Sequence, residues 1–174
     1  MSDADSIPAS RTHLKVVYPP GELTKQNWLQ IARVYWRMAR LIGSALRTRN
    51  VTLAQFEIMA ILNATQGISQ QELAGHLLVT KGNVCTVISR MQESGLINRI
   101  PDPADGRAKQ LFLTQTGRNL FGRVAPLVHG AVEEIFANLN LGQQQELQQL
   151  LDQLECGLMQ KGLPASAIGT DADS

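Results

Sequence analysis

The sequence has few of the residues that build metal sites and disulfide frameworks. It contains two cysteines without paired spacing and three widely separated histidines, His13, His76 and His129. Because neither residue type has metal-ligand spacing, we expect no metal site and no disulfide framework. The chain also lacks a glycine-rich phosphate loop, a nucleophile motif and the paired carboxylates of a hydrolytic cleft. We therefore expect a protein without a cofactor that is not an enzyme.

Long hydrophobic runs are also missing. No apolar stretch approaches the roughly 20 residues that cross a bilayer. The N-terminal segment MSDADSIPAS is acidic and polar, unlike a signal peptide. These absences predict a cytoplasmic protein that has no membrane partner. A length of 174 residues suits one domain with a hydrophobic core, or one protomer of an interlocked dimer.

The net charge of +1 conceals an uneven distribution of charge along the chain. Between Lys25 and Arg123 there are thirteen Lys and Arg residues against five Asp and Glu, whereas residues 132–174 contain one Lys and seven acids. Such segregation predicts one basic face and an acidic region far from it. In a dimer, both basic faces could be turned toward one DNA duplex.

Residues 68–114 carry the most informative pattern, which begins with two short helices. Ser69 is a good N-cap for the first helix, and Glu72 completes a capping box three positions later. Thr80 can cap the second helix, which we expect to end near Gly95 because glycine often terminates helices. The short turn between these helices predicts a helix-turn-helix.

The second helix has apolar residues at helical spacing, which leaves a polar face with few acids. Such a face suits a helix lying against base edges, where an amide such as Asn83 can pair with adenine and Lys81 with guanine or a phosphate. Alone, a polar stripe more often means a solvated surface. We predict base contacts from Lys81, Asn83 and Thr86, and phosphate contacts from Ser69, Gln70, Thr80 and Arg90.

Two strand-like runs follow, the first beginning at Leu96 and the second covering residues 110–113. Pro and Gly residues break the chain between them, which predicts a hairpin with a loop. Arg107 and Lys109 would lie at or near the tip, where a basic side chain can enter a narrow minor groove. This basic tip beside the polar helix favours DNA binding over a merely solvated helix face.

The acids of the same loop, Asp102 and Asp105, are unsuited to DNA contact. We interpret them as turn formers, or as an anchor that pairs with Arg90 or Arg107 and fixes the loop.

Three segments of this region resemble the wing motif of the multiple antibiotic resistance regulator (MarR) family. They are the GLI step at 95–97, the DPADGR loop at 102–107 and the LTQTG run at 113–117. The resemblance covers roughly residues 24–160 and is most specific in the wing. It implies a winged helix-turn-helix transcription regulator. We expect a repressor that a small ligand releases from DNA, although an activator would dock on DNA in the same way. One departure is Gly106, where many family members have a second arginine.

The segments on both sides of residues 68–114 also have apolar residues at helical spacing, with Pro126 predicted to kink one helix. A 47-residue DNA module cannot bury four additional helices, so we expect pairing with a second chain. A two-fold dimer would place its recognition helices about 34 Å apart and would bind double-stranded DNA at an approximate palindrome.

The predicted fold class is mainly α with a small β-hairpin wing, a winged helix-turn-helix within a helical two-fold dimer. The predicted parts are an N-terminal arm (1–22), a dimerisation helix (23–50), the DNA-binding module (51–117), C-terminal dimerisation helices (118–161) and a disordered tail (162–174).

The resemblance also implies that a small anionic aromatic effector binds between the dimerisation helices and the DNA module. The first helix interleaves aromatics with arginines, and five arginines occur between Ile31 and Phe56 without an acid. This pattern suits a phenolic carboxylate or an acyl-coenzyme A thioester, although the same residues also fit a core and a solvated or DNA-facing surface. The candidate effector residues are Trp28, Tyr35, Trp36, Arg33, Arg37 and Arg40.

Two alternatives remain open at this point. Cys85 lies in the proposed recognition helix, where its oxidation would place a polar or bulky group close to DNA and make the protein redox-responsive. A winged helix can also be a protein-interaction module, in which case DNA affinity would be weak and independent of sequence.

Overall fold

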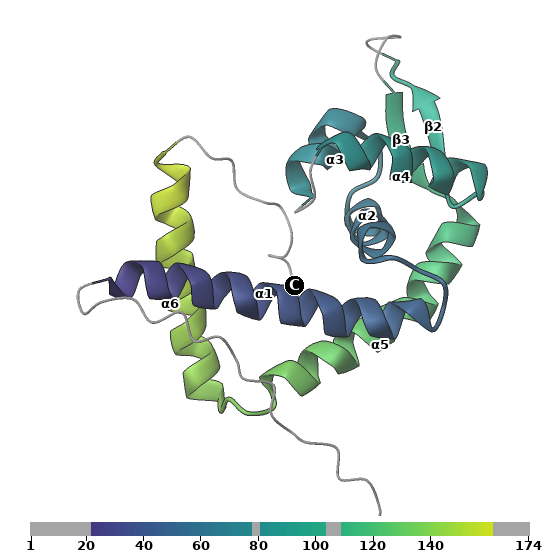
Figure 1. The fold of residues 1–174 in the computed structure, drawn as a ribbon. Coiled ribbons are helices and arrows are strands. Elements are labelled where there is room, and N and C mark those ends of the chain that lie inside the picture. Colours follow the sequence, from purple (N-terminus) through teal and green to yellow (C-terminus); the bar gives the residue numbers. More distant parts are fainter. Residues whose placement is uncertain (1–21, 78–80, 104–108, 162–174) are drawn as a thin grey trace, which may run out of the picture. The chain divides into compact units, whose positions relative to one another are not determined.

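The computed structural model describes residues 22–77, 81–103 and 109–161, with only the backbone described at 81–83 (Figure 1). The elements are α1 (Leu23–Arg47), α2 (Leu53–Ala64), β1 (Ile68–Ser69), α3 (Gln70–His76), α4 (Lys81–Glu93), β2 (Ile97–Pro101), β3 (Lys109–Leu113), α5 (Gln115–Phe136) and α6 (Leu141–Met159). The chain divides inside α1 into two units, residues 1–36 and 37–174. None of the described helices combines the length and apolar character of a membrane span.

Side-chain caps determine where several helices begin. Ser69 and Glu72 form the predicted capping box at α3: the Glu72 amide donates to Ser69 Oγ over 3.1 Å, and the Ser69 amide donates to Glu72 Oε2 over 2.7 Å. Hydrogen bonds from Ser69 to the Glu72 carboxylate, first the one from the Ser69 backbone and then one from its side chain, lower the pKa of Glu72. Equivalent boxes begin α2 at Thr52 and α6 at Asn140. The predicted cap at Ser69 is therefore confirmed, and each such cap satisfies amides that would otherwise lack a partner.

The hydrophobic core of the second unit joins the C-terminal end of α1 with α2, α3, α4, the sheet and α5. Figure 1 shows α2, α3 and α4 gathered beside the β2–β3 hairpin. Side chains with no exposed surface come from all these elements, and each contributes about 1.5–3 kcal/mol by its burial. They include Leu46, Ile58, Met59, Leu62, Leu73, Ile88, Met91, Ile97, Leu111 and Val124. Phe56 on α2 stacks on Phe121 of α5 with ring centroids 5.7 Å apart.

The sheet has three antiparallel strands in the order β1-β3-β2. The hairpin of β2 and β3 was predicted, but β1 was not. This strand contains only two residues, Ile68 and Ser69, which pair with Leu111 and Gln110. A two-residue strand is too short to show an alternating pattern in the sequence.

A tight junction joins the end of α4 to the start of α5. Gly95 adopts the left-handed conformation (φ +67°), which confirms the predicted helix end. Thr114 then caps α5: its amide donates to the Leu96 carbonyl over 3.0 Å, and its hydroxyl donates to the Gly95 carbonyl over 2.7 Å. The same hydroxyl accepts from the amide of Gly117 over 3.0 Å. The two helices are thus tied together at Leu96, although the whole wing separates them in sequence.

Candidate nucleic-acid interface

Helix α4 buries its apolar face and exposes its polar face, as the sequence predicted. Val84, Ile88 and Met91 are at most 1% exposed. On the opposite face Thr86 and Arg90 are exposed, which leaves them free to meet an external partner. Lys81 and Asn83 belong to the first turn of the helix, but their side chains fall outside the described part of the chain.

The wing begins and ends beside this helix. Lys109 is the first residue of β3, lies opposite Pro101 and is exposed. Asp102, at the end of β2, accepts a hydrogen bond of 3.0 Å from the side-chain amide of Gln110, which ties the base of the loop together. The predicted residues Arg107 and Asp105 fall outside the described residues.

Two of the predicted phosphate-binding residues have contacts within the protein. Ser69 caps α3 through its hydroxyl, as described above. Gln70, the first residue of α3, places its side-chain amide nitrogen 2.9 Å from the sulfur of Cys85 on α4. This contact links the two helices of the helix-turn-helix motif. Thr80, the third of these residues, lies outside the described part.

A hydrogen bond between α4 and the wing comes from Arg99, a residue to which the sequence alone assigns no role. The sequence predicts Arg90 as a partner for a wing acid, but within the described residues its side chain has no hydrogen bond or ion pair. Instead, Arg99 on β2 donates from its guanidinium to Ser89 Oγ on α4 over 2.9 Å. Arg90 points away from the core, so it cannot make this connection, whereas Arg99 lies on the sheet face that α4 covers.

The charges around this surface are mainly positive. The first turn of α4 contains no acid, and Glu93 is the only acidic residue in the helix.

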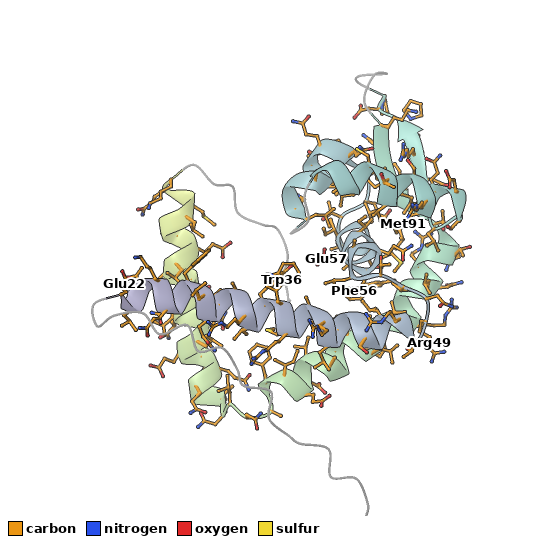
Figure 2. All side chains as sticks on the ribbon, in the orientation of Figure 1. Glu22, Trp36, Arg49, Phe56, Glu57 and Met91 are labelled. Atoms are coloured by element: carbon orange, nitrogen blue, oxygen red, sulfur yellow. The ribbon has the colours of Figure 1, made fainter. Side chains whose placement is uncertain are left out.

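The nearby α2 carries Glu57, next to Phe56 in Figure 2. Burial raises the pKa of the Glu57 carboxyl, and its Oε2 atom is buried without a hydrogen-bond partner among the described residues.

The candidate effector residues all lie on α1 and are all exposed. Trp28 is 67% exposed and Trp36 is 70% exposed, and Trp36 packs edge-on against Tyr35 with ring centroids 5.6 Å apart. Arg33 is exposed in the same unit, whereas Arg37 and Arg40 belong to the second unit. Figure 2 labels Trp36 on this helix.

Comparison with known proteins agrees with this geometry. The MarR family profile matches residues 51–109, the segment that contains α2 and most of the winged helix-turn-helix. An HTH-type transcriptional repressor of Mycobacterium tuberculosis is 31% identical over 113 residues, which cover 65% of this chain and 81% of the relative. The chain belongs to the MarR family. The fold class expected from the sequence, mainly α with a small β wing, is confirmed.

Solved structures of other MarR proteins have the same fold. A MarR-like regulator from Bacillus cereus superposes with a TM-score of 0.73 at 20% identity, covering 79% of this chain and 99% of the other. A mutant of MarR from E. coli, complexed with operator DNA, superposes with a TM-score of 0.70 at 25% identity and the same coverage. As a MarR-family protein, this chain is a DNA-binding transcription regulator.

Proposed function

We propose that this protein is a homodimeric transcription repressor that binds an approximately palindromic operator. In this proposal α4 enters the major groove and the wing reaches the minor groove. Lys81, Asn83 and Thr86 read bases, while Ser69, Gln70, Thr80 and Arg90 contact phosphates. Arg107 and Lys109 act from the wing.

The observation that carries the DNA-binding part is the two-sided character of α4. One side is anchored in the core, so the helix is held rigidly, and the other side presents Thr86 and Arg90 to solvent. A rigid helix with an exposed, acid-poor face is what major-groove docking requires. The E. coli MarR relative was crystallised with operator DNA, which supports the same role for this chain.

The homodimer is supported by apolar side chains that the single chain leaves in contact with water. On α6, Leu150, Leu154 and Leu158 follow one another at a spacing of four residues and are each more than 50% exposed. Exposed apolar surface of this extent marks an interaction site. We therefore assign α6 and the exposed apolar side chains of α1 to the dimer interface.

Selection from a random duplex library tests DNA recognition and identifies the operator sequence at the same time. The purified protein should enrich one sequence with two related half-sites about 10 base pairs apart, centre to centre. Enrichment of a single half-site would contradict the palindromic arrangement, and enrichment of nothing would leave a protein-interaction module as the better assignment.

Light scattering of Leu154→Glu tests the dimer. A charge in the assigned interface should shift the protein from dimer to monomer, because an unpaired buried carboxylate is costly. Gln153→Glu adds the same charge to a neighbouring exposed position and serves as the control. A dimer that survives Leu154→Glu would remove α6 from the interface.

The proposal also includes release of the operator by a small anionic aromatic or its coenzyme A thioester. Trp28, Tyr35, Trp36, Arg33, Arg37 and Arg40 are the residues proposed to bind it. The tie between α4 and α5 at Leu96 supports a mechanical coupling, since a shift of α5 would carry the recognition helix with it. A change of a few ångströms between the two recognition helices would spoil their match to successive grooves, and about 1–3 kcal/mol of coupling is enough for regulation.

A thermal-shift screen tests the effector. The panel contains phenolic acids and coenzyme A thioesters, with neutral aromatics as matched controls. A ligand at about one hundred times its dissociation constant should stabilise the protein by about 2.7 kcal/mol. Arg40→Ala should abolish the shift, whereas Arg123→Ala on α5 should keep it. No shift with any anion would contradict this part of the proposal.

A further inference from the structure

The β2 strand carries a polar residue on the face that should be apolar. Residues directly opposite each other in an antiparallel pair point to the same face of the sheet. Ile97 lies opposite Leu113, and Arg99 lies opposite Leu111. Ile97, Leu111 and Leu113 are at most 2% exposed, so this face packs on the core. Arg99 therefore points inward, toward α4.

The next residue along the strand reverses the expected pattern. Ile100 points to the outer face and is 48% exposed, although an apolar side chain would suit the inner face better. The guanidinium of Arg99 is partly buried, and its Nε atom has no hydrogen-bond partner among the described residues. Enclosing a cation in this way is unfavourable unless it makes a specific bond. Violations of the inside-outside pattern of this kind tend to occur at functional positions.

The bond that Arg99 does make joins the two elements that contact DNA in the proposed function. Its guanidinium donates to Ser89 Oγ over 2.9 Å. Ser89 lies on α4 next to Arg90 and one turn after Thr86. We propose that Arg99 is a positioning residue that sets the angle between the recognition helix and the wing by holding Ser89.

This role follows from where the two ends of the bond are attached. Arg99 lies in the middle of β2, and the residues before and after it also pair with β3, so its backbone is fixed. Ser89 is held by α4, which is anchored through Ile88 and Met91. A hydrogen bond between two rigid elements restricts their relative rotation. Both groove-binding elements then meet the duplex in one fixed orientation, which favours the matching sequence over others.

The inference rests on the proposed DNA-binding function, and the experiment separates the two. The wild-type protein is first used to select its duplex from a random library. Binding of that duplex and of a scrambled duplex is then measured at several salt concentrations for Arg99→Met, Ser89→Ala and the double variant. If the wild type selects no sequence, the proposed function fails; if it does, the variants test Arg99 alone.

The positioning role predicts that Arg99→Met and Ser89→Ala each lower the affinity for the selected duplex by about tenfold. The double variant should lose no more than either single variant, because both substitutions remove the same hydrogen bond and their effects are then not additive. The scrambled duplex and the salt dependence should change little. Asn98→Ala, exposed on the opposite face of the same strand, is the matched control and should bind like the wild type.

A direct phosphate contact from Arg99 gives a different result. Arg99→Met would then weaken both duplexes and reduce the salt slope by about 1, while Ser89→Ala would have no effect. Additive losses in the double variant would also overturn the positioning role. If Arg99→Met fails to fold, Ser89→Ala remains decisive: it removes only a hydroxyl, and unchanged specific affinity would contradict the inference.

Discussion

The carbonyl oxygen of Leu96 occupies the space that a Cβ atom at position 117 would need. Gly117→Ala would also bring the new methyl group 2.6 Å from Cδ1 of Leu113. Because backbone and core must both shift, we expect a loss of about 1–3 kcal/mol in the free energy of unfolding. Urea denaturation measures it. Gly122→Ala on the same helix, where a Cβ meets nothing within 4 Å, should instead stabilise the protein by up to about 1 kcal/mol. If the two variants change the free energy of unfolding equally, the close contact between Leu96 and Gly117 is contradicted.

Glu57 makes stability depend on pH. Burial raises the pKa of its carboxyl above 4.5, so the folded state holds the proton more tightly than the unfolded state. Stability from this group is therefore present at pH below 4.5 and is lost as the pH rises through the folded pKa. Glu57→Gln removes the charge and should stabilise the protein at pH 7.5 by about 1 kcal/mol, with the half-exposed position limiting the gain.

Melting temperatures at pH 4 and pH 7.5 check this prediction. The gain of Glu57→Gln should shrink at the lower pH, because the wild-type carboxyl is then protonated. Glu146→Gln, at an exposed position of α6, is the control and should give no such difference. A loss of stability at pH 7.5 would contradict the prediction and would show that the Glu57 carboxylate has a stabilising partner.

Arg107→Ala tests the wing. If Arg107 enters the minor groove as proposed, its removal should weaken binding of the selected duplex by about 1–3 kcal/mol and leave the proposed dimer intact. Titration of labelled duplex measures the affinity, and light scattering measures the dimer. Arg123→Ala removes the same charge from α5 and should have a smaller effect. If both variants bind DNA equally well, the wing has no part in recognition.

Cys85 reports whether the polar face of α4 meets DNA. Both cysteines are exposed, Cys85 on α4 and Cys156 on α6. We expect bound duplex to slow the alkylation of Cys85 by N-ethylmaleimide and to leave Cys156 unaffected, because in the proposed docking α4 enters the groove and α6 does not. Mass spectrometry of the two peptides gives the rates. Equal protection, or none at Cys85, would place α4 away from the DNA.

Local patterns were enough to predict most of the fold. The capping pair at Ser69, the helix end at Gly95 and the apolar spacing of α4 each involve residues close in sequence, so the chain itself reveals them. The role of Arg99 could not be read in the same way. In the short strand β2, the apolar residues Ile97 and Ile100 are three positions apart, so their side chains point to opposite faces of the sheet and the sequence does not show which face is buried. The pairing of Arg99 with Leu111 shows that Arg99 lies on the buried face. β1 depends on partners still farther along the chain, since Ile68 pairs with Leu111.

The sequence predicts the helix and the hairpin that carry the candidate site, but not the hydrogen bonds between them. The sequence placed Gln70 and Ser69 near phosphates, and the structure finds both in contacts that organise the helix-turn-helix itself. The capping contact of Ser69 is local and was predicted, whereas the contact of Gln70 with Cys85 joins side chains on different helices and leaves no periodic pattern in the sequence.

The hydrogen bond that joins the two ends of the wing, between Leu96 and Thr114, affects how the wing can vary in evolution. The chain leaves the body of the module at Leu96 and returns to the same carbonyl at Thr114. The segment 97–113 is therefore a hairpin whose two ends are joined by a hydrogen bond, and a change in the number of residues at its tip need not move α4 or α5. Evolution, or an engineer, can lengthen, shorten or exchange the tip of the wing to suit another operator while the core residues of β2 and β3 and the helices stay as they are.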